Sequence, residues 1–463
     1  MKAHVAALVI PFHYDMPFPD AAEAVNADRF EKAEPAADRC FEHIRTLVAH
    51  ASEPHTIGRM WKMTQRGRHA YGLPNNHRST LTCNSKAGTW TFAVTNVELY
   101  LFETGTGFLV HHIEFSGAAD ARSFTEGLYA LKKIAGYGNT IRYERRLSKT
   151  EAEMQSFSFA AAASEAVEPF AGRFFDGNGS TPAEAIVFSG ALLDVNTKEA
   201  GAEEFAADVL FRLRRAYREA YKPVSAHRSE ERDEFVIRPF ENSRFGVSLE
   251  GMANVVTRTG DPETDAFFEG AYFHQLKGTY LYLYILALHQ KYALVRLSKL
   301  AAGLQGELGG SRGSLRAQSD AIDALKQSCI RFMLRSSYHQ VTYNTHHSDV
   351  YELIRRRLRI EELMLEINES LHALAALTAI VEQALERKEE AAKREREEAF
   401  HRKITWITAL FLPLTVVCGL FGMELDLIQK ASGSVWPFLV VSLVAYSLTY
   451  LLFRVRFRAG TDA

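Results

Sequence analysis

The chain has few cysteines, no excess of charge of either sign, and none of the common metal-binding cysteine pairs. Its 463 residues include four cysteines, which lie far apart and form no Cys-x-x-Cys pair: Cys40, Cys83, Cys329 and Cys418. A disulfide framework or zinc knuckle is therefore not expected, and reduced cytosolic thiols are the simplest interpretation. The formal net charge of -2 lacks the basic excess of nucleic-acid-binding proteins, so we expect no nucleic-acid partner.

Enzyme chemistry also lacks support. We find no credible Ser-His-Asp arrangement, no His-Glu-x-x-His motif and no paired carboxylates. The glycine-rich segment 303–314 is expected to join two helices, whereas a phosphate-binding loop follows a strand. The loop 176–180 lacks the carboxylates of a calcium loop. The sequence predicts a protein that is not an enzyme and that carries no covalently bound cofactor.

The N-terminus lacks the features of a signal peptide. The apolar run at residues 5–12 is short, and no small-residue cleavage site follows it. We interpret this run as a buried strand. The large N-terminal part is therefore expected to stay in the cytoplasm.

Residues 1–262 read as a cytosolic α/β domain. The clearest signal is a hairpin in which Gly105-Thr106-Gly107 joins strands at 97–103 and 108–115. A further strand is expected at 185–188 and an amphipathic helix at 205–221. His111 and His112 are adjacent on a strand, so their side chains should face opposite ways and cannot both bind one metal directly.

Residues 263–403 are predicted to be helical. Helices are expected at 265–302 and 319–337, and no proline or glycine interrupts residues 351–406. Within this last segment, apolar or small residues recur at heptad spacing: Ile360, Leu363, Ile367, Leu371, Leu374, Thr378, Val381 and Leu385. Such a stalk helix needs partners to bury its stripe. Neighbouring chains of an oligomer or a helical hairpin within the chain would both provide them.

Two features near the stalk allow more than one interpretation. Positive and negative side chains alternate over residues 387–398, as on a solvated helix face or as in a charged collar around a pore mouth. His339, His346 and His347 cluster near Asp349 at the start of the stalk. This cluster fits either a polar helical corner or a regulatory metal site.

Two uncharged stretches mark a transmembrane domain at residues 404–463. They cover about 404–421 and 435–453, close to the shortest length that crosses a bilayer. His401, Arg402 and Lys403 precede the first stretch, and three arginines follow the second. The positive-inside rule then places both termini in the cytoplasm and the connecting loop outside.

The first stretch has one face that is not uniformly apolar. Its positions are Ile404, Thr408, Leu412, Thr415, Gly419 and Gly422, of which four are small or hydroxylated. Bulky apolar residues occupy the opposite face: Ile407, Leu410, Phe411, Leu414, Val417 and Phe421. The first face suits close packing against another helix or the lining of a wet pore, and the second suits lipid.

Residues 411–424, Phe-Leu-Pro-Leu-Thr-Val-Val-Cys-Gly-Leu-Phe-Gly-Met-Glu, resemble the end of the first transmembrane helix of CorA-type magnesium transporters. That family has a Phe-x-Pro-Leu-Thr run followed by a Gly-Met-Asn signature at the outer mouth. The layout agrees as well, with two C-terminal spans, a short outer loop, a long stalk helix and a large cytosolic α/β domain. The resemblance covers about residues 345–463 and is architectural before that.

The resemblance implies a CorA-like funnel, a homopentamer in the inner (plasma) membrane, which transports Mg²⁺ or another divalent cation. The pore would be lined by Ile404, Thr408, Leu412, Thr415 and Gly419, with His401 at the inner mouth. Gly422 and Met423 match the signature, while Glu424 replaces its asparagine and has Asp426 nearby. A ring of Glu424 carboxylates would bind metal cations strongly, which extends the expected ions to Zn²⁺, Co²⁺ and Ni²⁺.

Two functions therefore remain open on the sequence. The first is a divalent-cation channel or transporter whose gate is set by the cytosolic domain. The alternative is a membrane-anchored sensor or effector, in which the large N-terminal domain binds a ligand and regulates a leak or a vestigial pore.

Overall fold

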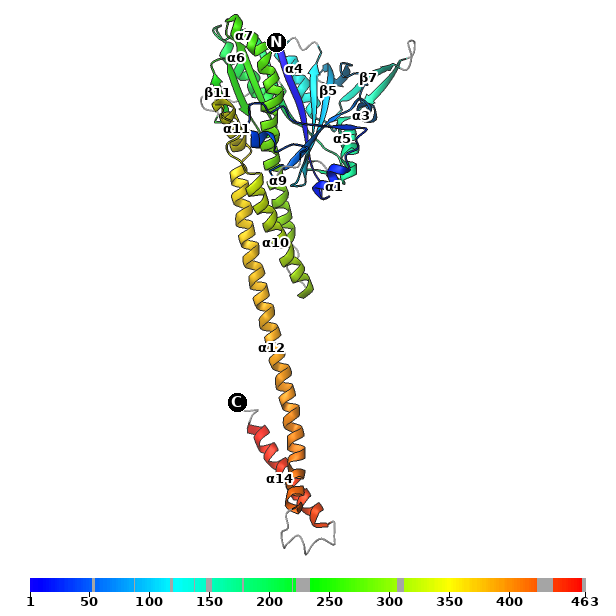
Figure 1. Cartoon of the computed structure of the whole chain (residues 1–463), viewed down its shortest axis with the longest axis vertical. Coiled ribbons are helices and arrows are strands. Elements are labelled where there is room, and N and C mark those ends of the chain that lie inside the picture. The colour runs from blue at the N-terminus through cyan, green and yellow to red at the C-terminus, as the bar shows by residue number, and fades with distance from the viewer. Residues whose placement is uncertain are drawn as a thin grey trace. The chain divides into compact units, whose positions relative to one another are not determined.

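A computed structural model describes residues 1–51, 55–86, 88–116, 120–136, 138–146, 152–176, 179–218, 220–221, 234–305, 312–422 and 436–459. The chain divides into two compact units, Met1–Leu374 and Ala375–Ala463 (Figure 1). This division confirms an N-terminal α/β unit followed by a helical region. The finer boundaries at 262/263 and 403/404 remain predictions.

The first unit is built on one sheet, which has thirteen strands in the described part of the chain. Ten of them lie in the order β11-β12-β13-β10-β1-β6-β5-β4-β7-β8, while β3 bridges β2 and β5, and β9 pairs with β1. The parallel pair is β10 with β13, and the remaining pairs are antiparallel. The strands are β1 (Ala3–His13), β2 (Phe30–Ala33), β3 (Gly58–Met63), β4 (Leu81–Ser85), β5 (Gly88–Phe102), β6 (Thr106–Phe115), β7 (Thr140–Arg146), β8 (Ala152–Phe157), β9 (Arg173–Phe174), β10 (Ile186–Asn196), β11 (Val236–Phe240), β12 (Ser243–Val247) and β13 (Gly251–Arg258).

The predicted N-terminal strand and hairpin are confirmed. β1 lies near the middle of the sheet, where both faces are covered, and this explains its continuous apolar run. β5 and β6 form an antiparallel pair that ends with Phe102 opposite Thr106. Gly105, between these two residues, has a φ of 73° and allows the chain to turn. Glycine adopts this left-handed conformation at no steric cost.

Helices cover both faces of the sheet and create two apolar cores. One core includes side chains from α4 (Ala121–Lys132), α5 (Phe159–Val167) and α6 (Ala202–Arg215), so the helix predicted at 205–221 begins and ends earlier. The other includes side chains from α7 (Pro262–Glu269), α8 (Ala271–Gln275), α9 (Leu281–Gln305), α10 (Arg312–Arg335) and α11 (Thr345–Arg357). Short elements complete the unit: α1 (Phe18–Glu23), α2 (Glu42–Arg45), α3 (Gln65–Ala70) and the 3₁₀ turn η1 (Glu168–Phe170).

The helix predicted over residues 265–302 is interrupted at its start. Gly270, at φ -116° and ψ -87°, separates α7 from α8, and a π-helical turn, η4 (Leu276–Tyr280), leads into α9. The first turns of α9 are buried all round, from Leu281 to Leu288. Burial of each such side chain stabilises the fold by roughly 1.5–3 kcal/mol, which is why this run forms a core helix.

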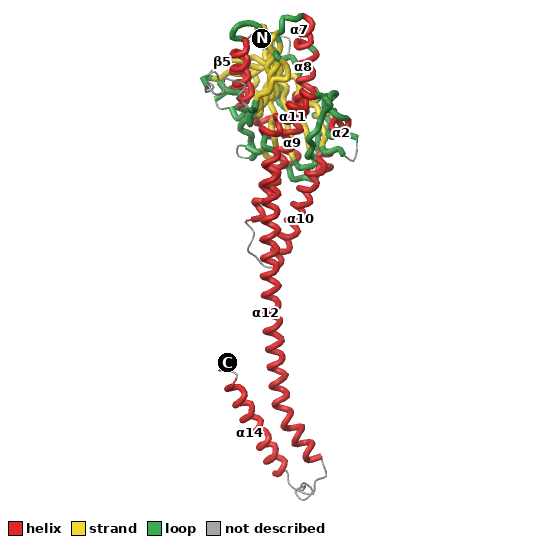
Figure 2. Tube along the Cα trace, turned by 90° about the vertical axis from the view of Figure 1, so that its left-hand side faces the viewer, coloured by secondary structure: helices red, strands yellow, loops and turns green. Residues whose placement is uncertain are grey.

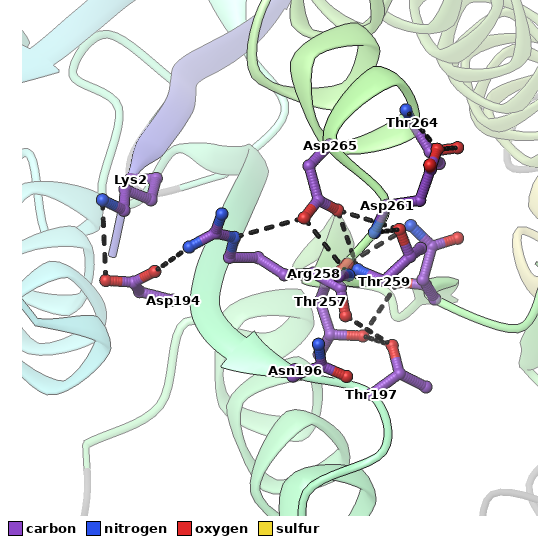
Figure 3. A network of polar contacts seen from close by, with 12 residues as sticks. Lys2, Asp194, Asn196, Thr197, Thr257, Arg258, Thr259, Asp261, Thr264 and Asp265 are labelled. Carbon is purple, nitrogen blue, oxygen red and sulfur yellow. Dashed lines mark hydrogen bonds and ion pairs between the residues drawn. The ribbon is translucent and has the colours of Figure 1, made fainter.

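A polar network holds the beginning of α7 against the ends of β10 and β13 (Figure 3). The Asp265 carboxylate accepts hydrogen bonds from the Thr259 backbone N–H at 2.8 Å and the Gly260 N–H at 3.3 Å. Arg258 Nε lies 3.4 Å from Asp265, and its Nη1 lies 3.2 Å from Asp194. Burial opposes the charge of Asp265, but these hydrogen bonds keep its pKa below the ordinary value.

The uninterrupted helix predicted from residue 351 is wrong at one position. α11 ends at Arg357, Arg359 has a φ of 56°, and α12 (Ile360–Gly422) starts immediately after it. The turn allows both Leu358 and Ile360 to be buried, at 2% and 1% exposure. Burial of these two side chains offsets the roughly 1–2 kcal/mol cost of a left-handed conformation at a residue other than glycine.

The first part of the stalk stripe is covered within the chain. Ile367, Leu371 and Leu374 belong to the same core as Ile322 and Phe332 of α10. Figure 2 shows α9, α10 and the start of α12 next to one another. For residues 360–374, the stripe is therefore buried by helices of the same chain, as in the second of the two arrangements that the sequence allowed.

The second unit contains the rest of α12 and α14 (Trp436–Ala459). The charged segment 387–398 is helical as predicted, and its side chains are exposed except for the half-buried Glu389. Judged by length and composition, one helical segment in the described part of the chain, Ile360–Ile380, is apolar enough to cross a membrane, and Leu439–Leu451 is a shorter apolar stretch.

We retain the interpretation of Ile360–Ile380 as a stalk segment. Glu366 and Glu369 are exposed on it, while its apolar stripe up to Leu374 packs into the core of the first unit. A carboxylate near the bilayer centre is costly, by roughly 2.5–3.5 kcal/mol on insertion scales. The predicted spans at 404–421 and 435–453 include side chains outside the described part and remain predictions.

Candidate pore helix

The last third of α12 carries the face that the sequence singles out. Ile404, Thr408, Leu412 and Thr415 are exposed on it. A Cβ added at Gly419 would meet no atom within 4 Å, so open space lies beside this position. The structure thus places these side chains on one uncovered face of a continuous helix.

The threonine hydroxyls on this face are satisfied by the helix itself. Thr408 Oγ1 donates to the Ile404 carbonyl at 2.9 Å, and Thr415 Oγ1 contacts the carbonyls of Phe411 at 2.9 Å and Leu412 at 3.0 Å. A hydroxyl has one proton and two lone pairs. Since the proton is used by the backbone, the free lone pairs of each oxygen can accept from water or contact a cation.

The opposite face is buried at one of its described positions. Val417 lies on it and is only 1% exposed. Ile407 and Phe411 remain exposed at 58% and 56%. Both faces are therefore largely exposed at their described positions, and the small and hydroxylated side chains are what distinguish the first face.

The inner end of this face begins at His401. Its side chain is exposed, and its carbonyl accepts the Thr405 hydroxyl at 2.8 Å. Ile404 follows three residues later on the same helix and is 43% exposed. The assignment of His401 to an inner mouth and of Ile404 to a constriction remains a prediction.

The outer end of the predicted pore is Gly422, the final residue of α12. Met423, Glu424 and Asp426, predicted with it as the selectivity filter and the metal ligand, lie outside the described residues. Their roles rest on the sequence.

The adjacent histidines of β6 face opposite sides of the sheet, as predicted. His111 is fully buried and contacts the Tyr71 hydroxyl at 2.7 Å. Burial lowers the pKa of His111 to about 3, so this ring stays neutral. On the other face, His112 Nε2 lies 3.1 Å from Glu98 Oε1.

The histidines before the stalk do not assemble a metal site in the described part of the chain, where no group of three candidate ligands occurs. His347 is buried and stacks on Tyr280, with 4.5 Å between ring centroids. His339 Nδ1 contacts Arg355 at 2.5 Å. The polar-corner interpretation is therefore the better description of this cluster, because packing and a cation already occupy two of its imidazoles.

The sequence analysis missed several buried charged side chains, and Glu98 and Arg68 are two of them. Glu98 alternates with Tyr100 and Phe102 on one face of β5, so strand periodicity marks it as an inward-facing carboxylate. Arg68, in the short helix α3, is 6% exposed, and no periodic pattern identifies it.

No curated protein gives a significant match to the chain. Residues 302–457 match the family model described as CorA-like Mg²⁺ transporter protein. This range includes α10, α11, the whole of α12 and most of α14. The match supports the CorA family for this chain and, in general terms, a membrane protein that transports divalent cations.

Proposed function

We propose that the chain is a CorA-type divalent-cation channel or transporter whose pore is lined by the last third of α12. In this proposal Ile404, Thr408, Leu412, Thr415 and Gly419 face the pore, and His401 lies at its inner mouth. The residues of the outer mouth are Gly422, Met423, Glu424 and Asp426.

The observation that carries the proposal is the exposed face of α12 that bears hydroxyl groups. Thr408 and Thr415 present oxygens whose protons are already used by backbone carbonyls. Oxygen ligands suit a hard divalent cation or its hydration shell. Small side chains on the same face allow water to enter, while Ile404 and Leu412 form apolar constrictions that can close by dewetting.

A single α12 helix cannot enclose a pore, so the proposed pore requires several copies of the chain. One helix offers an oxygen on one side of a passing ion, whereas a ring of helices surrounds the ion with oxygens. We therefore propose a homopentamer, by analogy with the family, in the inner (plasma) membrane with both termini in the cytoplasm. Beyond Leu374 the stalk stripe would pack against other copies, since the covering by α10 ends there.

The outer mouth is proposed to select ions by charge. Five Glu424 carboxylates at one level would attract cations and would share protons, because like charges raise the pKa values of some members. A neutral asparagine suits hydrated Mg²⁺, which dehydrates reluctantly. Glutamate instead favours direct coordination, and passage of Zn²⁺, Co²⁺ or Ni²⁺ beside Mg²⁺ follows from it.

The test is ion uptake into liposomes that contain the purified full-length protein, with Mg²⁺, Zn²⁺, Co²⁺ and Ni²⁺ compared. Glu424→Lys is expected to abolish uptake by electrostatic repulsion, and Glu424→Asn is expected to shift preference toward Mg²⁺. Glu369→Lys is the matched control, since it reverses an exposed carboxylate of α12 far along the chain from the mouth.

Unchanged flux in Glu424→Lys would remove Glu424 from the pore mouth. If folded, oligomeric wild-type protein takes up none of the four ions, the sensor or effector function becomes the better explanation. The large α/β unit then has to be the functional part, and its ligand has to be sought there.

A further inference from the structure

The sheet of the first unit has a gap along one edge of β5. β6 pairs with one edge of this long strand, and both β3 and β4 pair with the other. β3 covers Glu98–Phe102 and β4 covers Gly88–Phe92, so neither strand pairs with residues 93–97. Backbone groups at such an interruption need other hydrogen-bond partners.

A β-bulge lies within this strand gap. The register between β5 and β6 shifts between Val94 and Asn96, which leaves Thr95 as the extra residue. Bulges re-aim side chains and are frequent next to functional sites. Here Thr95 and Asn96 line a cavity of about 550 Å³.

The connection from β3 to β4 closes the other side of this cavity. It contains α3 and the loop 73–80, and it contributes Gln65, Arg68, Asn75, Asn76 and His77 to the lining. A second cavity of about 690 Å³ adjoins the first, since Asn75 and Asn76 line both. Cavities of this size accommodate small organic molecules.

Arg68 is the unusual member of this lining. Its Nε donates to the Pro74 carbonyl at 3.1 Å, and its Nη2 is closed to solvent without a hydrogen-bond partner. The described residues place no carboxylate in an ion pair with it. Burial lowers the pKa of the guanidinium, and no neighbouring acid counteracts this effect. An arginine stays charged in proteins, so a buried cation lacks its counter-charge.

The backbone that carries Arg68 is fixed. A Cβ at Gly67 would lie 2.1 Å from the Arg29 carbonyl oxygen, so only glycine fits beside the turn that precedes β2. Thr64 caps α3 by accepting from the Gly67 N–H at 3.0 Å. The guanidinium is therefore held in place before any ligand arrives, which reduces the entropic cost of binding.

The surrounding side chains favour an anion. The first cavity has no acidic side chain in its lining, whereas Gln65, Asn75 and His77 offer polar groups. The second cavity adds Arg78 and Arg145 and contains one acid, Glu144. Arg145 itself contacts His69 at 2.9 Å, and so one wall of the second cavity is basic.

We propose that the strand gap of β5 binds a small oxyanion-bearing metabolite, a phosphate or carboxylate compound, with Arg68 as its buried anchor. The oxyanion would neutralise the guanidinium, and the remainder of the molecule would extend past Asn75 and Asn76 into the second cavity. This site is separate from the proposed pore and gives the first unit a ligand of defined charge.

The test measures binding and not transport. Thermal unfolding of full-length protein in detergent is followed in divalent-free buffer with inorganic phosphate, ADP or citrate, against chloride at matched ionic strength. Wild type is expected to unfold at a higher temperature with at least one of these oxyanions. ADP and phosphate against citrate then separate the phosphate source from the carboxylate source.

Arg68→Met is the decisive variant. Without ligand it is expected to unfold at the wild-type temperature or above, because replacing an unpaired buried charge with an apolar side chain removes a cost. Its affinity for the oxyanion is expected to fall by at least about tenfold, the weight of a charge-assisted hydrogen bond. Arg66→Met, which removes an exposed arginine two residues away, is expected to bind as wild type does.

His77→Ala gives a second route if Arg68→Met fails to fold, since His77 lines the same cavity. Weaker binding in this variant would support the site. The proposal is overturned if no oxyanion stabilises the wild type, or if Arg68→Met and His77→Ala both bind it with wild-type affinity.

Discussion

His112 Nε2 lies 3.1 Å from Glu98 Oε1 between two neighbouring strands, where the two side chains are only 15% and 9% exposed. The Tyr100 hydroxyl donates to the other carboxylate oxygen at 3.0 Å. Burial alone would raise the pKa of Glu98, but His112 and Tyr100 bring it below its ordinary value. Glu98 is therefore a charged group on the sheet face that also carries Tyr100 and Phe102.

Removal of one partner should be costly. Glu98→Ala is expected to destabilise the protein by roughly 1–3 kcal/mol, because it leaves the buried Tyr100 hydroxyl and His112 without their shared partner. His112→Ala should cost a similar amount, and the double variant less than the sum. Chemical denaturation of the full chain in detergent measures this, with the exposed Glu114→Ala as control. Additive losses would show that the two residues act independently.

Acid should weaken the fold through its buried histidines. Burial lowers the pKa of His347 to about 3, and Arg39 and His346 add to the effect. The unfolded chain takes up a proton near its ordinary pKa of 6.5, whereas the folded chain does not. Stability therefore falls as the pH drops from about 6.5 toward 3, by up to about 1.4 kcal/mol per pH unit for each such histidine.

His347→Phe isolates one of these contributions. Phenylalanine keeps the ring that stacks on Tyr280 and cannot be protonated. Unfolding free energies between about pH 7 and pH 5 should decline less steeply in this variant than in wild type. His43→Phe, which removes an exposed imidazole, should keep the wild-type slope. An identical slope in His347→Phe would mean that the ring is not kept neutral by the fold.

Sequence patterns predicted the elements that depend on periodicity. The central strand β1, the β5–β6 hairpin and the heptad stripe up to Leu374 are all repeats of buried apolar positions, and they appear where expected. The break at Arg359 was not predictable, because neither proline nor glycine marks it. Its cause is the burial of Leu358 and Ile360 against distant parts of the chain.

The candidate sites likewise include some that the sequence could predict and one that it could not. The face of α12 follows from helical spacing, and the outer mouth from a local motif. Arg68 and the gap in the sheet depend on two strands that share one edge of β5, which is a long-range relationship. No local pattern encodes it, so it emerges only once the strand register is known.

Leu374 is the last residue of the stalk stripe that lies in the core of the first unit. It is 1% exposed, whereas Leu377, which is three residues on and outside the stripe, is 43% exposed. Leu374→Ala is expected to lower the unfolding free energy by roughly 2–5 kcal/mol through the cavity it creates. Leu377→Ala should change it by less than about 0.5 kcal/mol. Equal losses, measured by denaturation of both variants, would place Leu377 in the same core.

The hydroxyl oxygens of α12 provide the most discriminating test of the proposed pore. Thr415→Val keeps the shape of the side chain and removes its oxygen. If Thr415 lines the pore, the passing cation loses one oxygen contact in every copy, and uptake into liposomes should fall by about tenfold or more.

Thr449→Val is the matched control for this variant. Thr449 makes the same type of hydrogen bond, to the Ala445 carbonyl at 2.7 Å, but belongs to α14 and not to the proposed pore helix. Both substitutions therefore remove one hydroxyl-to-carbonyl bond from a helix of the second unit, and any effect on helix stability should be shared. A loss of uptake in Thr415→Val alone would assign the oxygen to the ion path. Equal losses in both variants would mean that the hydroxyls only support their helices, and the exposed face of α12 would then be a packing surface.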